Sequence, residues 1–199
     1  MAAPSRIAGS QDVDVVAGIM AAAFYSDPVW GWAFPDPERR LEQHHAAWGF
    51  LVEAALEHEW VFLTEGGGAA ALWIPAGRPE LSAEQAERFD ELLREICGEW
   101  AGRALDTVER FDRAHPEVEQ PFYYLSLLGT HPDHRGKGFG MGLVAESLAR
   151  IDEAGAAAYL ESTNPANHRR YESVGFEPWA SFELAEAGPD VLQMWRPPR

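Results

Sequence analysis

The sequence is poor in cysteine and in basic residues. Cys97 is the single cysteine among 199 residues, which excludes an internal disulfide framework. Lysine and arginine total 16 against 32 aspartates and glutamates, so the formal net charge is -16 at pH 7. Most of such a surface would repel DNA or RNA, and we expect no nucleic-acid partner. The acidity either attracts a cationic small molecule or serves solubility alone, and composition leaves both open.

Long apolar runs are missing as well. No stretch approaches the ~20 apolar residues that cross a bilayer, and we expect no membrane partner. Asp12 and Asp14 interrupt the first apolar segment, so we expect no signal peptide and a soluble, cytoplasmic protein. Disorder is excluded, since eight Trp and ten Phe among 46% hydrophobic residues can fill the core of one globular domain.

Apolar spacing divides the first half of the chain into helices and one hairpin. Proline-containing segments at 27–28 and 35–37 predict breaks between the first two helices. Ser82 and Gln85 form the pattern of a capping box, with which a helix begins. In chain order we predict a short strand at 5–8, helices at 13–24 and 38–59, hairpin strands at 60–64 and 69–74, and a helix from 82 that continues in broken form to Pro116.

Strands and helices alternate in the second half. Residues 122–130 are almost continuously apolar, which predicts a strand buried on both faces. We further predict a helix at 138–154, a strand at 157–161, a short helix at 165–174, and hairpin strands at 176–184 and 191–196. The first half of the chain shows signals of antiparallel strands, and the second half shows a strand-helix-strand-helix unit. Together they favour a single mixed α/β (α+β) domain over two domains.

A basic, glycine-rich segment, Arg135-Gly136-Lys137-Gly138-Phe139-Gly140, connects the apolar strand to the amphipathic helix. Glycines let backbone N–H groups approach a ligand, and a helix start adds unpaired donors and a positive dipole end. The segment therefore predicts a phosphate or pyrophosphate site. Met141 and Leu143 stand where the dinucleotide fingerprint needs glycine, and Gly138 follows Lys137 where a Walker motif needs Ser or Thr. The alternative is a tight turn with exposed charges.

The spacing of this segment matches a known family. Arg135, Gly138 and Gly140 after a strand resemble the acetyl-CoA-binding motif, Arg-x-x-Gly-x-Gly, of the GCN5-related N-acetyltransferase (GNAT) superfamily. A second motif of that family, Asn followed by Tyr and then Gly-Phe, is similar to Asn164, Tyr171, Gly175 and Phe176. The resemblance covers residues 122–195 well and the earlier half only in the order of its elements.

The resemblance implies the fold and the donor. It implies one domain over residues 1–199, with a central mixed, mostly antiparallel twisted sheet of six to seven strands flanked by helices. The acetyl-CoA-binding half would span about 121–199 and the acceptor half about 1–120. Within the family, residues 130–138 and Leu160-Glu161-Ser162 with Tyr171 are most similar to the puromycin N-acetyltransferases, which favours a small amine as acceptor.

The resemblance also implies which residues bind acetyl-CoA. The backbone of the strand before the loop would pair with the pantetheine arm, and Gly129 would suit a bulge that splays this strand from the next one. The loop would hold the pyrophosphate, and a short helix would border the thiol end. The implied residues are Leu127, Leu128, Gly129, Thr130, Arg135, Gly136, Lys137, Gly138, Phe139, Gly140, Asn164, Asn167 and Arg170.

Two residues are candidates for the proton transfers that acetylation of an amine requires. Tyr171 would donate its phenolic proton to the leaving thiolate, because an ordinary tyrosine is protonated at neutral pH. The alternative is an aromatic side chain that only packs on Phe176. Glu161 would take the proton of the amine if burial raises its pKa. Its alternatives are an electrostatic role in orienting the amine or a helix cap.

Five residues at 24–34 are candidates for the acceptor site. Phe24, Tyr25, Asp27, Trp30 and Phe34 would form an aromatic box with one carboxylate, which suits a cationic, partly aromatic amine. The alternative is a hydrophobic plug over the sheet. His131 and His134 lie close in sequence, but no further ligand stands at a known metal spacing, so we expect no metal.

The sequence thus predicts an acetyl-CoA-dependent N-acetyltransferase that moves an acetyl group to the primary amine of a small cationic molecule by direct transfer in a ternary complex. Two alternatives stay open, a peptide or protein amine as acceptor and a non-catalytic acyl-CoA sensor. A homodimer is also left open.

Overall fold

A computed structural model describes residues 4–185 and 187–199. Its strands form one seven-stranded sheet in the order β1-β2-β3-β4-β5-β7-β6. The strands are β1 Ser5–Ile7, β2 Val61–Thr64, β3 Ala69–Ile74, β4 Phe122–Thr130, β5 Ala157–Ser162, β6 Glu177–Glu183 and β7 Asp190–Arg196. Only the β4–β5 pair is parallel among these neighbours. The prediction of a mixed, mostly antiparallel sheet within one α/β domain is confirmed.

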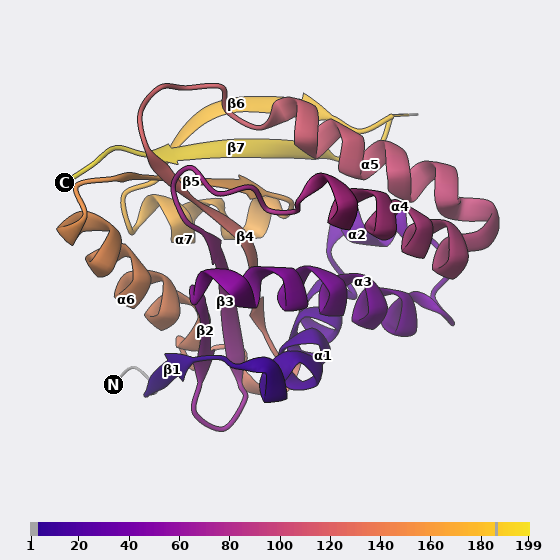
Figure 1. Cartoon of the computed structure of the whole chain (residues 1–199), viewed down its shortest axis with the longest axis horizontal. Helices are drawn as coiled ribbons and strands as arrows, with labels where there is room; N and C mark the ends of the chain where they lie inside the picture. Colours follow the sequence, from indigo (N-terminus) through magenta and orange to yellow (C-terminus); the bar gives the residue numbers. More distant parts are fainter. Residues whose placement is uncertain (1–3, 186) are drawn as a thin grey trace.

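Helices cover both faces of this sheet. They are α1 Val13–Phe24, α2 Pro28–Ala33, α3 Arg40–Ala55, α4 Ala83–Cys97, α5 Ala101–Ala114, α6 Phe139–Glu153 and α7 His168–Glu172. Short 3-10 segments are η1 Ser10–Asp12, η2 Leu56–His58, η3 Gly98–Trp100, η4 Pro132–His134 and η5 Pro165–Asn167. In Figure 1, α6 lies across the central strands from α1 and α3. No helix in the described ranges combines the length and apolar character that crossing a bilayer requires.

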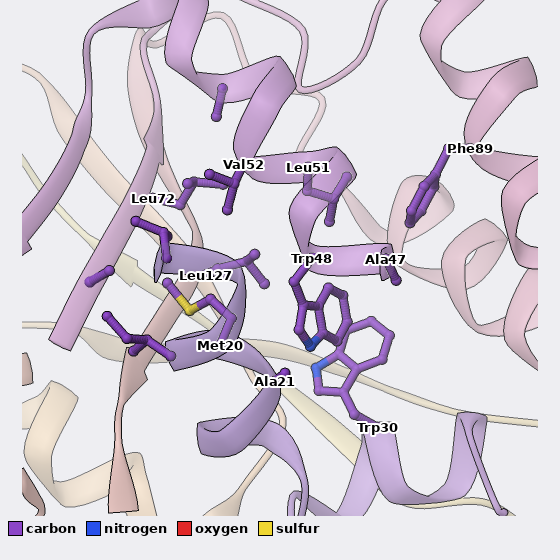
Figure 2. Close-up of a cluster of buried hydrophobic side chains, with 14 of the residues drawn as sticks. Met20, Ala21, Trp30, Ala47, Trp48, Leu51, Val52, Leu72, Phe89 and Leu127 are labelled. Carbon is purple, nitrogen blue, oxygen red and sulfur yellow. The ribbon is translucent and has the colours of Figure 1, made fainter. Parts of the chain in front are cut away.

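Alternating side chains of β3 supply two separate cores. Leu72 and Ile74 join the cluster under α1 to α5, whereas Ala71 and Trp73 join the cluster under α6. Successive side chains of a strand point to opposite faces, so a strand covered on both sides is apolar throughout. Figure 2 shows the first cluster, where Leu72 from β3 lies among side chains of α1, α3 and β4.

The sequence predicted only a break in the chain at 27–28, but the structure has a helix, α2, that begins there. Asp27 Oδ1 accepts hydrogen bonds from the N–H groups of Val29 at 3.0 Å and Trp30 at 3.3 Å. Pro28 occupies the first helical position, where its missing N–H costs nothing. Asp27 is therefore the N-cap of α2.

Strand β4 departs from the prediction in two ways. Its residues alternate between buried and half-buried, so one side is not fully covered. Its bulge lies at Ser126 and not at Gly129, because Leu72 pairs with Leu127 while Trp73 pairs with Leu125. Gly129 instead lets α1 approach, since a Cβ there would lie 2.6 Å from the Met20 sulfur. The extra residue directs Ser126 into a cavity that the apolar pattern could not reveal.

The capping box at the start of α4 is confirmed. The Ser82 hydroxyl accepts from the Gln85 N–H at 3.2 Å, and the Gln85 side chain accepts from the Ser82 N–H at 2.8 Å. We expect Ser82→Ala to lower the free energy of unfolding by about 1 kcal/mol, because one helical donor loses its partner. Urea denaturation measures this, with Ser82→Asp as the control that keeps an acceptor. Equal losses in both variants would contradict the assignment.

Candidate functional site

The glycine-rich loop forms an open helix start between η4 and α6. Gly136 and Gly138 both have φ of 77°, a left-handed conformation that favours glycine. In α6 the Gly142 N–H donates to the Gly138 carbonyl at 2.9 Å, and no described side chain caps the helix. The N–H groups of residues 139–141 therefore lack intrahelical partners. This geometry can bind an anion, as the sequence predicted for the segment.

Contacts on two sides hold the loop at the end of β4. A Cβ at Gly140 would lie 2.7 Å from the Thr130 hydroxyl oxygen, so glycine allows α6 to approach the strand closely. Arg135 donates to the Ala23 carbonyl at 3.1 Å and remains exposed. Lys137 Nζ lies 3.3 Å from His134 Nδ1. Both cationic side chains therefore flank the helix start.

The two histidines of this segment serve local structure. The Asp133 N–H lies 3.4 Å from His131 Nδ1, which places His131 at the start of η4. The His134 ring stacks on Phe139 with the centroids 5.7 Å apart. Within residues 4–185 and 187–199, no three His, Cys, Asp or Glu side chains gather as metal ligands would.

Strands β4 and β5 separate after their first four residue pairs, and a cavity of about 550 Å³ lies at the separation. Their last pair joins Leu125 to Leu160. From residue 126 to 130, the edge of β4 that faces β5 has no strand partner in the described chain. Leu127 and Leu128 both line the cavity, although they pack toward opposite faces of the sheet. The gap thus connects both faces and leaves backbone groups of β4 open to a ligand.

Glu161 lines this cavity with one carboxyl oxygen unpartnered. Its Oε1 accepts from the Tyr159 hydroxyl at 2.6 Å, while Oε2 is shielded from solvent and has no hydrogen-bond partner in the described chain. Desolvation raises the pKa of Glu161 to about 8 and Glu80 adds to the shift, although interactions with the hydroxyls of Tyr159 and Tyr124 oppose it. A carboxyl of this kind can accept a proton near neutral pH.

Glu80 is a second carboxyl in the cavity, and sequence reasoning missed it. It lies between β3 and α4 and accepts a hydrogen bond from the hydroxyl of Ser126, the bulged residue of β4. Burial raises the pKa of Glu80 to about 7, and the neighbouring Asp112 adds to the shift. Nothing in the local pattern marks an acidic residue after Pro79 as internal, so only the bulge and the loop path bring it here.

Tyr171 lines the cavity from α7, across the gap from β4. Its side chain is buried, and burial with the nearby Asp27 raises the pKa of its phenol to about 12. The phenol therefore holds its proton at neutral pH. The ring also packs edge-on against Phe176, with the centroids 6.1 Å apart, so both of the uses considered for Tyr171 are compatible with its position.

The polar residues predicted around α7 take different places. Asn167 lines the cavity and accepts from Arg170 at 2.7 Å. Arg170 itself is exposed. Asn164 accepts from the Ala166 N–H at 3.0 Å and so caps η5. Of these three residues, only Asn167 reaches the cavity directly.

The predicted aromatic box is only partly assembled. Phe24, Trp30 and Phe34 line the cavity and pack around Trp48. Tyr25 lies outside it, where its hydroxyl donates to the Pro37 carbonyl at 2.9 Å. Asp27 caps α2 and accepts from Thr163 at 2.8 Å, so the structure does not offer it to a ligand. The acidic groups that line the cavity with these aromatic side chains therefore include Glu80 and Glu161 but not Asp27.

Comparisons with known proteins agree with this geometry. The model of the acetyltransferase (GNAT) family matches residues 23–176. A solved structure described as histone acetyltransferase HPA2 and related acetyltransferase from Corynebacterium glutamicum has a TM-score of 0.71 at 24% identity, covering 100% of this chain and 98% of that chain. For the polyamine N-acetyltransferase of Drosophila melanogaster the TM-score is 0.64 at 17% identity, with coverages of 96% and 98%. For arylalkylamine N-acetyltransferase 2 from Aedes aegypti the TM-score is 0.63 at 14% identity, and the match covers 98% of this chain and 99% of that chain. At these identities, the likeness to the solved structures shows a shared fold.

Proposed function

Because the chain belongs to the acetyltransferase (GNAT) family and is an N-acetyltransferase, we propose that it transfers an acetyl group from acetyl-CoA to the primary amine of a small cationic molecule. Donor and acceptor would meet in one ternary complex. The observation that carries the proposal is the cavity at the separation of β4 and β5. Glu161, whose Oε2 has no hydrogen-bond partner in the described chain, and Tyr171 both line this cavity.

The residues around the loop fit acetyl-CoA. The N–H groups of residues 139–141, together with Arg135 and Lys137, would hold the pyrophosphate. The free edge of β4 at residues 126–130 would pair with the amides of the pantetheine arm, as an added strand would. Gly136 and Gly138 already have the left-handed conformation that favours glycine in such a loop.

The proposed proton transfers depend on the protonation states of Glu161 and Tyr171. When bound, acetyl-CoA would supply an acetyl thioester whose carbonyl carbon an amine can attack. Glu161 would take one proton from the ammonium at Oε2, directly or through a water molecule. Tyr171 would give its proton to the departing sulfur and regain one from the nitrogen. The balance is one new C–N bond, one broken C–S bond and one proton released.

The size and lining of the cavity support a small acceptor. About 550 Å³ lies within the range of small-molecule sites, and aromatic side chains line one wall. The similarity of residues 130–138 to the puromycin N-acetyltransferases makes puromycin one amine to test. A peptide amine is the second candidate, because the NatC complex bound to Gag peptide and CoA shares the fold at a TM-score of 0.58.

A thiol-release assay with acetyl-CoA tests the proposal across free amines, puromycin and lysine-containing peptides. We expect thiol release that depends on a free amine and exceeds the peptide rates. Faster thiol release with peptides than with free amines would indicate that the acceptor is a peptide amine. Tight acetyl-CoA binding without turnover of any acceptor would instead indicate a sensor.

Replacing Gly140 by valine should weaken acetyl-CoA binding roughly ten-fold. The new side chain would meet the Thr130 hydroxyl and displace the start of α6 from β4, and helix-start contacts with an anion contribute about 1 kcal/mol. Titration calorimetry measures the Kd, with circular dichroism to confirm folding. Gly18→Val is the matched control, because no atom lies within 4 Å of a Cβ in that part of α1. Equal affinity of the Gly140 variant and wild type would refute the loop assignment.

A further inference from the structure

Four carboxylates follow one route from the inner cavity to the surface. Glu161 and Glu80 lie inside, and Asp112 and Asp90 lie where the cavity meets a more open groove between α4 and α5. Asp112 and Asp90 line both hollows, so the cavity and the groove lie next to each other there. Residues of α4 and α5 line this groove, and Figure 1 shows these two helices side by side at the edge of the molecule.

This route is lined by more acidic than basic side chains. Glu161 Oε2 has no partner in the described chain, and Glu80 accepts from the neutral hydroxyl of Ser126. Two arginines also line the hollows. Arg94 lies 3.6 Å from Asp90 as an exposed helical pair, and Arg78 is exposed at the rim. Arg94 balances the outer end in part, whereas the inner carboxylates have no cation beside them.

The pKa shifts of the groups that line the hollows are consistent with an excess of acidic over basic groups. Desolvation raises the pKa of Asp112, and Asp90 and Glu109 raise it further. Desolvation lowers the pKa of His115, which also lines the cavity, so the imidazole adds no positive charge at neutral pH. A ligand with more than one positive charge would relieve this repulsion.

Apolar side chains lie among the acidic groups that line the cavity. Phe89 and Leu93 from α4 and Val108 and Phe111 from α5 line the cavity beside the carboxylates. A chain of methylene groups would fit such a wall, whereas a second polar group in the middle would lose its hydration. The hollows therefore suit a molecule that is charged at both ends and apolar between them.

We infer that the acceptor is a linear diamine or polyamine whose reacting primary amine lies at Glu161 and Glu80, and whose second cation lies at Asp112 and Asp90. This inference rests on the proposed function and names its substrate class. Asp112 and Asp90 would then be specificity-determining residues, because they contact the part of the acceptor that does not react, whereas Glu80 would position the reacting amine.

The test compares α,ω-diaminoalkanes of increasing length with the matched 1-aminoalkanes in the thiol-release assay. We expect kcat/KM for the best diamine to exceed that of its matched monoamine about ten-fold, which corresponds to about 1.4 kcal/mol for the second ion contact in a partly open site. Asp112→Asn should lower this ratio about five-fold. Glu95→Gln is the matched control, because Glu95 is exposed on α4 and lines neither hollow, and it should leave the ratio at the wild-type value.

Several outcomes would overturn the inference and can be told apart from failure of the proposed function. Equal kcat/KM for diamines and monoamines, or a preference for puromycin or another aromatic monoamine, would overturn it while the acetyltransferase proposal stands. An unchanged ratio in a folded Asp112→Asn variant would also overturn it. If no amine is acetylated, the proposed function fails. Calorimetry then decides the inference, because diamines must still bind more tightly than monoamines, and equal or absent heats would overturn it.

Discussion

Replacing Glu161 by glutamine lowers kcat/KM for amine acetylation by about a hundred-fold or more and removes the acid limb of the pH–rate profile. Glutamine keeps the size of the side chain but cannot accept the proton, and a positioned general base contributes roughly 10²-fold or more to a rate. The variant replaces the carboxyl of Glu161, a residue that lines the cavity and whose Oε2 has no hydrogen-bond partner in the described chain.

The pH dependence follows from the raised pKa of Glu161. With a pKa of about 8, the carboxyl is mostly protonated at pH 7 and gains its basic form as the pH rises. Wild-type kcat/KM should therefore climb through an acid limb near pH 8. Initial rates at saturating acetyl-CoA over a pH series measure this limb. An acid limb in Glu161→Gln identical to that of wild type would contradict proton abstraction by this group.

Stability gives a readout that is independent of turnover. The folded pKa of Glu161 is raised above its ordinary value near 4.5, so the native state holds an extra proton between about pH 4.5 and pH 8. Wild type must lose stability relative to Glu161→Gln as the pH rises through this window, and the difference is complete above pH 8. Thermal melts of both proteins measure it. Glu177→Gln on the exposed strand β6 is the control and should show no such trend.

Replacing Tyr171 by phenylalanine lowers kcat by about a hundred-fold and changes the Kd for acetyl-CoA little. The variant keeps the ring that packs on Phe176 but removes the proton that burial holds on the phenol, whose pKa is raised to about 12. A positioned general acid typically contributes roughly 10²-fold or more. Single-turnover rates and calorimetry separate the chemical step from binding.

A matched tyrosine distinguishes chemistry from packing. Tyr123 on β4 packs against Trp60 with the rings tilted and the centroids 4.6 Å apart, and it does not line the cavity. Tyr123→Phe should keep wild-type kcat. If Tyr171→Phe also retains wild-type kcat, Tyr171 only packs, and the proton for the leaving sulfur comes from elsewhere.

Much of the fold follows from local signals in the sequence. The capping box of Ser82 and Gln85 and the glycines around Gly138 act within one turn of chain, so their neighbours in sequence are also their neighbours in space. The order of strands and helices follows from apolar periodicity in the same way. Glu161 and Tyr171 were predicted as candidates through the resemblance, and both line the cavity.

Other features depend on contacts between distant segments. Asp27 looked like a free carboxylate beside aromatic residues, but the fold uses it to cap α2 and to accept from Thr163, so its oxygens are occupied. The bulge at Ser126 depends on how β4 pairs with β3, and that pairing joins residues far apart in the chain.

The sequence by itself therefore determined most of the elements, the glycine loop and the family, because each depends on residues close together along the chain. The tertiary structure alone decided which carboxylates share the cavity. Glu80 comes from a loop, Asp90 and Asp112 from a helix pair, and Glu161 from a strand. No local pattern couples these four positions, since their mutual repulsion arises only once packing removes water and brings them to one wall.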